Sequence, residues 1–186
     1  MNKEDKIETF NNIKDKLQEV SPQKDPVDNV QWVDMDKVEG NEYNPNKVAP
    51  PEMKLLKLSI NEDGYTQPIV CYKKDDKYEI VDGFHRNLIP KKYKYIRERM
   101  NGKLPIVVIE KDIKERMAST IRHNRARGKH GVGEMSDLVA DLVKKGWEDE
   151  DIAEQLGMDF DEVLRLKQQT GLPEIFKDED FSKSWR

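Results

Sequence analysis

The pentapeptide Asp82-Gly83-Phe84-His85-Arg86 holds the residues of this sequence best suited to binding phosphate. It follows the alternating run YEIV, which predicts a strand, and it precedes a predicted helix. A glycine at such a junction lets the backbone approach a ligand, and the first turn of the helix offers free N–H groups and a positive dipole end. Arg86 can bind a phosphate through two parallel hydrogen bonds, and His85 adds a donor. We therefore predict that Gly83, Phe84, His85 and Arg86 form a phosphate-binding turn.

Carboxylates near this turn suggest chemistry beyond binding. Asp82 could bind Mg²⁺ or accept a proton from an attacking hydroxyl. Glu42, in the proline-containing loop NEYNPN (41–46), is a second candidate for a catalytic acid or base, and Glu39 competes with it. His85 completes the set of catalytic candidates. The alternative is that Asp82 caps the following helix while His85 and Arg86 are solvated.

A second cluster, TIRHNRARGKHG (120–131), places several cations around Asn124. Positively charged side chains that lie this close together repel one another unless they face solvent or an anion. We predict that Asn124 assists Asp82 in binding Mg²⁺. The predicted phosphate ligands are Asn124, Arg125 and Arg127, and the predicted nucleic-acid contacts are Arg122, Arg125 and Lys129.

The order NPN, DGFHR and HNRAR, followed by a helix-turn-helix pattern, resembles the ParB/sulfiredoxin superfamily. The longer strings WVDMDKVEGNEYNPNKVAPPEMKLL, VDGFHR, TIRHNRARGKH and GMDFDEVLRL are similar to the IbrB-type branch, known as coactivators of prophage gene expression. The resemblance covers about residues 30–186. It implies an α+β fold in which a ParB/sulfiredoxin-like mixed sheet with helices is followed by a C-terminal helix-turn-helix-like helical domain.

The resemblance also implies roles for individual residues. ParB proteins that segregate chromosomes bind CTP through a Gly-Glu-Arg-Arg box and a Glu-Asn-x-x-Arg box, which correspond here to residues 83–86 and 123–127. The glycine, the asparagine and the final arginine of each box match, whereas Phe84 and His123 replace the two glutamates. We therefore expect a nucleoside di- or triphosphate with Mg²⁺, and ATP or ADP rather than CTP. Phe84 also replaces the catalytic cysteine of sulfiredoxin, which excludes that activity, and Cys71 is expected in the core.

Two further relatives share the turn. ParB-like free-serine kinases carry an Asp-Gly-x-x-Arg turn and a catalytic glutamate about 40 residues earlier, and Glu42 and Asp82 have that separation here. Proteins with a DGQHR motif, from DNA-phosphorothioation systems, share the turn and are linked to NTP hydrolysis. The resemblance thus implies the phosphate-handling form of the fold.

The elements that must position these residues follow from hydrophobic spacing and turn residues. Strands are predicted at 30–38, 68–72, 78–83 and 104–110, with a hairpin turn at 75–76. Helices are predicted at 51–63 with Gly64 just past the end, from about 86 to 100, and at 113–128. In the first of these helices the candidate core residues are Leu55, Leu56, Leu58 and Ile60.

Outside this central block, the spacing of apolar residues predicts an amphipathic helix over residues 3–20. We expect its apolar residues Ile7, Phe10, Ile13 and Leu17 to pack into the core, and the alternative is that they pack on a partner. Residues 134–170 predict three short helices, and the window 149–168 fits a helix-turn-helix with Gly157 at the turn. Its helices are predicted to touch through Ile152, Leu156, Val163 and Leu166.

Four segments result: an amphipathic helix and linker (1–29), a ParB/sulfiredoxin-like nucleotide-binding domain (30–130), a helix-turn-helix-like domain (131–172) and a tail (173–186). No run approaches the roughly 18 apolar residues of a membrane span, and the single cysteine permits no internal disulfide. We expect a cytoplasmic protein without membrane contact, and the sequence is compatible with a homodimer.

Charge is distributed unevenly along the chain. Residues 85–130 carry 14 Lys and Arg against 4 Asp and Glu, which indicates an anionic partner. The alternative is a series of solvated helix faces. Residues 131–172 carry 4 basic and 11 acidic residues, which disfavours tight DNA binding by the helix-turn-helix alone.

Three functions fit these observations. The first is a nucleotide-binding regulator or coactivator that contacts DNA, if at all, through the basic block. The second is a small-molecule kinase, acting on a serine-like acceptor, or an NTPase, with Glu42 and Asp82 as catalytic acids. The third is a non-catalytic interaction module for an IbrA-like protein of the phosphoadenosine-phosphosulfate reductase family. Its docking surface would be the N-terminal helix or the tail, although for the tail packing onto its own domain is favoured. The sequence leaves turnover open.

Overall fold

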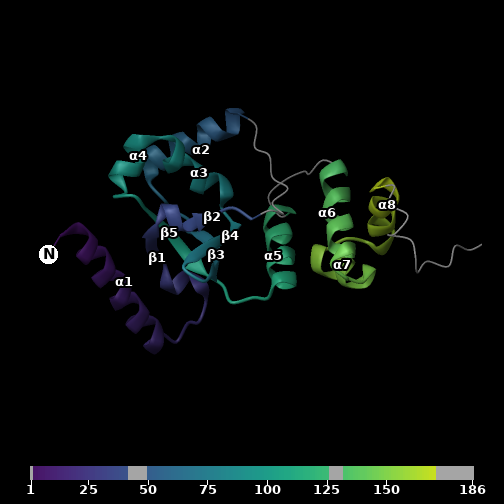
Figure 1. The fold of residues 1–186 in the computed structure, drawn as a ribbon, viewed down its shortest axis with the longest axis horizontal. Helices are drawn as coiled ribbons and strands as arrows, with labels where there is room; N and C mark the ends of the chain where they lie inside the picture. The colour runs from purple at the N-terminus through teal and green to yellow at the C-terminus, as the bar shows by residue number, and fades with distance from the viewer. Residues whose placement is uncertain (1, 42–49, 126–131, 171–186) are drawn as a thin grey trace, which may run out of the picture. The chain divides into compact units, whose positions relative to one another are not determined.

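The computed structural model describes residues 2–41, 50–125 and 132–170 (Figure 1). The chain divides into two compact units, Met1–Thr120 and Ile121–Arg186, which are described separately below. Among the described residues, no helix is long and apolar enough to cross a membrane.

A five-stranded mixed sheet forms the centre of the first unit, in the order β1-β5-β3-β4-β2. The strands are β1 (Gln31–Asp34), β2 (Val38–Glu39), β3 (Ile69–Lys74), β4 (Lys77–Asp82) and β5 (Lys103–Val108). The pairs β1–β5 and β3–β4 are antiparallel, while β3–β5 and β2–β4 are parallel. The predicted α+β fold with a mixed sheet is confirmed.

Local chemistry explains the β3–β4 hairpin, which brings the phosphate turn to the end of a central strand. Asp75 adopts a left-handed backbone with φ of 52°, a conformation that Asp tolerates better than most residues. On β3, Ile69 and Cys71 are fully buried and Val70 between them is only half-buried, as the pleat requires. The predicted core position of Cys71 is confirmed.

Three helices lie together on one side of the sheet in Figure 1: α2 (Pro50–Asp63), α3 (Phe84–Lys92) and α4 (Lys94–Arg99). The prediction of one helix from about 86 to 100 was wrong, because Tyr93 takes an extended backbone that separates α3 from α4. Leu55 and Leu58 were also wrongly placed in the core, since they are 67% and 55% exposed. The helical period turns Ile60 inward and these two leucines outward.

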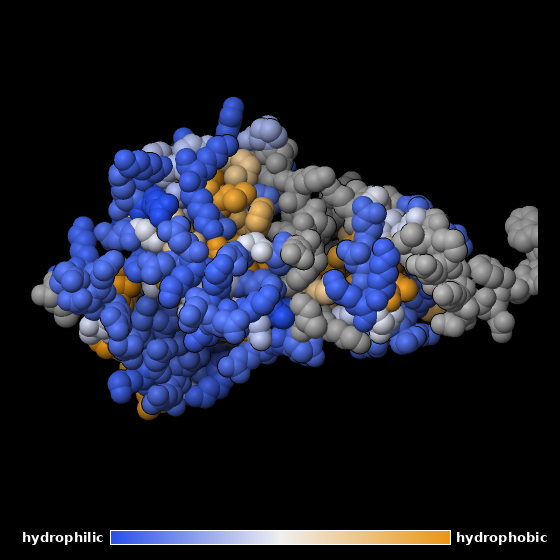
Figure 2. All heavy atoms as spheres, viewed as in Figure 1, coloured by the Kyte–Doolittle hydropathy of each residue, from blue (hydrophilic) through white to orange (hydrophobic). Residues whose placement is uncertain are grey.

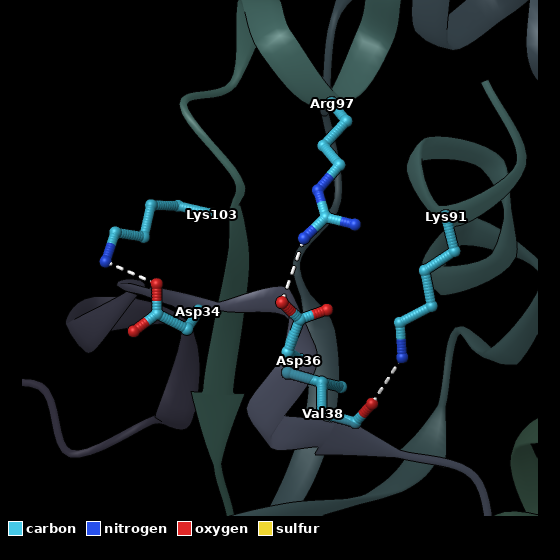
Figure 3. A network of polar contacts seen from close by, with 6 residues as sticks. All are labelled: Asp34, Asp36, Val38, Lys91, Arg97 and Lys103. Atoms are coloured by element: carbon cyan, nitrogen blue, oxygen red, sulfur yellow. Dashed lines mark hydrogen bonds and ion pairs between the residues drawn. The ribbon is translucent and has the colours of Figure 1, made fainter. Parts of the chain in front are cut away.

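Cations from the predicted basic block hold the segment between β1 and β2 in place (Figure 3). Lys103 Nζ lies 2.6 Å from Asp34 Oδ1, and Arg97 Nη2 lies 2.8 Å from Asp36 Oδ2. Lys91 donates to the carbonyl of Val38 at 2.6 Å. Part of the positive charge of residues 85–130 therefore serves the fold itself.

The N-terminal helix α1 (Lys3–Val20) has no buried residue. Phe10, Ile13 and Leu17 are 49%, 50% and 60% exposed, so the prediction that they pack into the core was wrong. The side of α1 that faces the sheet is polar: the Asn11 amide donates to the Trp32 carbonyl at 2.8 Å and accepts from the Trp32 N–H at 3.0 Å. These two bonds satisfy the N–H and the carbonyl of Trp32 on β1, which is an edge strand of the sheet.

The second unit contains α6 (Val132–Lys144), α7 (Asp149–Leu156) and α8 (Phe160–Thr170). Gly157 ends α7 in a left-handed conformation with φ of 60°, as the predicted turn requires. The four predicted contact residues are buried: Ile152, Leu156, Val163 and Leu166. The helix-turn-helix prediction is confirmed. Helix α5 (Ile113–Arg125) contains the division between the units at residues 120 and 121.

Candidate phosphate-binding site

The predicted phosphate turn lies where β4 ends and α3 begins. Gly83 is the residue before α3 and has φ of 94°, which L residues with a side chain rarely adopt. Because glycine carries no side chain, it cannot cap the N–H groups of the first helical turn as Ser or Asp would. The local backbone thus has the arrangement that binds anions at helix N-termini.

The guanidinium of Arg86 lies directly against Gly83. A Cβ atom on Gly83 would sit 2.9 Å from Arg86 Nη2 and 3.0 Å from Nε. Glycine is therefore required here for two reasons, the backbone conformation and the space that the guanidinium occupies.

Two side chains hold this guanidinium. Arg86 Nη1 donates to Gln67 Oε1 at 2.7 Å, and Nη2 donates to Asp82 Oδ2 at 3.2 Å. The side chains of Arg86 and Asp82 are 12% and 5% exposed. The pair is thus shielded from water, which makes the orientation of Arg86 well defined.

Tyr65 stabilises the same turn from the loop before β3. Its hydroxyl donates to the carbonyl oxygen of Arg86 at 2.6 Å. Pro90 lies four residues after Arg86 and has no N–H, so the usual helical donor to that carbonyl is missing. The Tyr65 hydroxyl replaces it. Burial raises the pKa of this hydroxyl, so it remains protonated and able to donate at neutral pH.

The two remaining residues of the turn differ in surroundings. Phe84 packs with the core, and its Cε2 atom would lie 2.7 Å from a Cβ on Gly40, so the ring rests on the backbone after β2. The imidazole of His85 lies edge-on to the Phe84 ring, with 5.5 Å between ring centres. Burial lowers the pKa of His85, and the charge of Glu52 offsets that effect in part. His85 is therefore mainly neutral at pH 7.

Several predicted site residues lie outside the description of the structure. Glu42, Arg127 and Lys129 are outside the described residues, and Asn124 and Arg125 belong to α5 with side chains that are not described. Arg122 donates to the Gln155 side chain of α7 within the second unit, and its predicted contact with nucleic acid stays a prediction. The convergence of the loop at 41–46 and the two basic clusters thus stays a prediction.

The described residues do not fit a directly bound Mg²⁺ at this turn. Asp82 is the only carboxylate among residues 82–86, and it is buried against the Arg86 guanidinium. No group of three or more His, Cys, Asp or Glu side chains in the described part of the chain is arranged to hold a metal ion. The same pairing orients the Arg86 guanidinium, and a catalytic role for Asp82 stays a prediction.

Sequence reasoning did not single out Tyr65 and Gln67. Both belong to the string DGYTQPIV, which has no periodicity or charge pattern that points to a site. Another missed residue is Arg116 of α5, which lies 3.0 Å from Glu79 and stacks over the Tyr72 ring at 3.7 Å. It belongs to the basic block but attaches α5 to the sheet of the first unit. Among the described side chains of the block, Arg86, Arg97, Lys103 and Arg116 pair with acids from earlier in the chain.

Comparisons with known proteins agree with this architecture. A family model for the ParB N-terminal domain matches residues 19–124, and a model for the IbrB-like C-terminal HTH domain matches residues 130–178. The chain is 49% identical over 184 residues to the uncharacterized protein YbdM of Escherichia coli (strain K12), which covers 98% of this chain and 88% of that protein.

More distant relatives are chromosome-partitioning proteins. The chain is 26% identical over 157 residues to the probable chromosome-partitioning protein ParB of Rickettsia bellii (strain RML369-C). The match covers 83% of this chain and 52% of that protein, so this chain spans about half the length of that relative. Among solved structures, C-terminally truncated ParB from Caulobacter crescentus complexed to the centromeric parS site has a TM-score of 0.51 at 22% identity, covering 77% of this chain and 73% of that one. The same protein complexed with CTP-gamma-S has a TM-score of 0.43 at 23% identity, with coverage of 78% and 80%.

Proposed function

Because this chain belongs to the family of ParB N-terminal domains and carries an IbrB-like helix-turn-helix segment after that domain, we propose that it is a nucleotide-binding regulator whose turn from Asp82 to Arg86 receives the phosphates. One observation carries the proposal. The Arg86 guanidinium is fixed by Gln67 and Asp82 against a left-handed glycine at the start of α3. A cation, a helix N-terminus and a close backbone approach coincide there, which are the features that bind phosphate.

Each residue of the turn has a separate task in this proposal. Gln67 is neutral, so it can hold Arg86 equally well with and without a phosphate. Asp82 is an anion and competes with an incoming phosphate for the guanidinium, so binding weakens the Asp82–Arg86 pair. His85 is neutral before binding, and a phosphate nearby favours its protonated form. The nucleotide that we expect is ATP or ADP, with Mg²⁺ carried by its phosphates.

We assign the regulatory role in this proposal to the second unit. The exposed residues of its helix-turn-helix are mainly acidic, among them Glu150, Asp151 and Asp161, whereas Arg165 of α8 is an exposed base. Such a surface suits contact with a protein better than contact with DNA phosphates. We propose an IbrA-like protein as the candidate partner of this surface.

A kinase or NTPase activity has less support from the described residues. It would need a carboxylate able to act as general base. Asp82 is paired with Arg86, and Glu42 lies outside the described residues.

Calorimetric titration of the full chain with ATP, ADP, CTP and GTP, with and without Mg²⁺, tests the proposal. We expect at least one nucleotide to bind, and Arg86→Ala to weaken that binding roughly 10- to 100-fold, because a hydrogen bond to a charged group contributes about 1.5–3 kcal/mol. Arg97→Ala is the matched control, since Arg97 is a 43% exposed arginine of the same unit that pairs with Asp36. No binding by any nucleotide, or equal affinity in Arg86→Ala and wild type, would overturn the assignment.

A further inference from the structure

Helix α1 has its polar side against the protein and its apolar side outward. Its polar attachment continues beyond Asn11, since Lys14 Nζ donates to the Val30 carbonyl at 2.6 Å and Gln31 donates to Asp15 at 2.8 Å. In the same helix Phe10, Ile13, Leu17 and Val20 are 49%, 50%, 60% and 79% exposed. Figure 2 shows small apolar patches at the edge of the molecule where α1 lies, on a face that is mostly hydrophilic and carries larger apolar patches over other elements. This is the reverse of the usual orientation of an amphipathic helix.

The exposed residues form a regular seam. Lys3, Lys6, Phe10, Ile13, Leu17 and Val20 follow one another at spacings of 3, 4, 3, 4 and 3 residues. This alternation is the a/d pattern of a helix that pairs with another helix. With 18 residues and a capping box of Asn2 and Asp5 at its start, α1 offers about 27 Å of continuous helix.

Charge decides what kind of helix fits the seam. The flanking e and g positions are Ile7, Thr9, Lys14 and Lys16, and none of them is acidic. Lys14 is bonded to the Val30 carbonyl, so the exposed cations that a partner helix would meet are Lys16 and the seam residues Lys3 and Lys6. The acids of α1 lie at the other positions, away from the seam: Glu4, Asp5, Glu8, Asp15 and Glu19. A second copy of α1 would oppose lysine with lysine or with a neutral residue, so self-pairing gains no charge complementarity. A helix with acidic flanks would gain it at Lys3, Lys6 and Lys16.

A hollow beside the seam supplies a place for a large side chain. A pocket of about 510 Å³ is lined by Lys6, Ile7, Phe10, Trp32, Tyr65 and Met100 among others. Phe10 belongs to both the seam and this pocket. An aromatic or long aliphatic side chain from a paired helix could enter it, as central hot-spot residues do in helix-in-groove interfaces.

We propose that the seam of α1, together with this pocket, is a docking surface for an amphipathic helix of a partner protein whose apolar stripe is flanked by Asp and Glu. A lipid surface fits less well. The apolar stripe is narrow, five acids lie on the same helix, and a flat membrane would leave the pocket unfilled.

The test uses two synthetic helical peptides of three heptads with Leu at the seam positions, one with Glu at the flanks and one with Lys. Binding of each peptide to the full chain is measured by fluorescence anisotropy at low and high salt. We expect the Glu peptide to bind at least tenfold more tightly than the Lys peptide, with the difference shrinking at high salt. Ile13→Asp and Leu17→Asp should each weaken binding at least tenfold, while Lys6→Glu with Lys16→Glu should reverse the preference between the peptides.

Leu58→Asp is the matched control, because Leu58 is a 55% exposed leucine of α2 outside the seam. Circular dichroism checks that each variant folds. Equal binding of the two peptides, binding of neither, or an equal loss in Leu58→Asp overturns the proposal. If the chain sediments with phosphatidylglycerol vesicles and Leu17→Asp abolishes this co-sedimentation, the seam is assigned to a lipid surface instead. Self-association that Ile13→Asp abolishes would assign it to a second copy of this chain.

Discussion

Replacing Gly83 with alanine separates the two reasons for a glycine at the phosphate turn. The left-handed conformation, with φ of 94°, costs a residue with a side chain roughly 1–2 kcal/mol. The new Cβ would also lie 2.9 Å from Arg86 Nη2, so the guanidinium must move away from its bonds to Gln67 and Asp82. Because the guanidinium ends a flexible side chain, we expect the displacement to affect ligand binding more than stability.

Gly102→Ala provides the control for backbone strain alone. Gly102 has φ of 70°, and no heavy atom beyond its own and those of its two chain neighbours lies within 4 Å of the position that its Cβ would take. Both variants should therefore lose roughly 1–2 kcal/mol of unfolding free energy, or about 2–8 °C in Tm. Only Gly83→Ala should weaken nucleotide binding, by roughly tenfold, because only this substitution displaces Arg86.

Differential scanning calorimetry and titration of both variants with the best-binding nucleotide measure the two effects. Equal affinity for nucleotide in the Gly83 and Gly102 variants would refute the reasoning, since it would show that the position of the Arg86 guanidinium does not matter for binding. A Gly83 variant as stable as wild type would refute the assignment of backbone strain.

Three further predictions concern other contacts. Burial lowers the pKa of His85 below 6.5, and a bound phosphate favours the protonated imidazole, so nucleotide binding near pH 6 should take up protons. Titration in buffers of different ionisation enthalpy should show this uptake in wild type and its absence in His85→Gln. Tyr65→Phe should cost about 1 kcal/mol in a denaturant melt, because the Arg86 carbonyl loses a donor that Pro90 cannot replace. Lys167→Met should destabilise the second unit by roughly 2–4 kcal/mol in thermal melts, because it leaves the carboxylate of Asp149 unpaired; adding Asp149→Asn should recover part of the loss.

The sequence was sufficient for features that depend on neighbours in the chain. The DGFHR turn, the β3–β4 hairpin at Asp75 and the turn at Gly157 each follow from a few adjacent residues whose backbone preferences are strong. The apolar contacts of the helix-turn-helix follow from helical period, and the predicted residues Ile152 and Val163 are buried. Periodicity alone does not say which apolar stripe finds a partner, and for this reason Phe10 and Leu58 were misplaced.

The tertiary structure decided what the charged residues do. By composition, the cations of residues 85–130 form one basic block, yet Arg97, Lys103 and Arg116 pair with acids that lie 37 to 69 positions away in sequence. Gln67 likewise reaches Arg86 only because β3 and β4 run side by side in the sheet. Ion pairs and hydrogen bonds act over a few ångströms in space, and only the folded chain determines which side chains come that close. Sequence therefore located the turn, and the fold determined which side chains hold Arg86 at it.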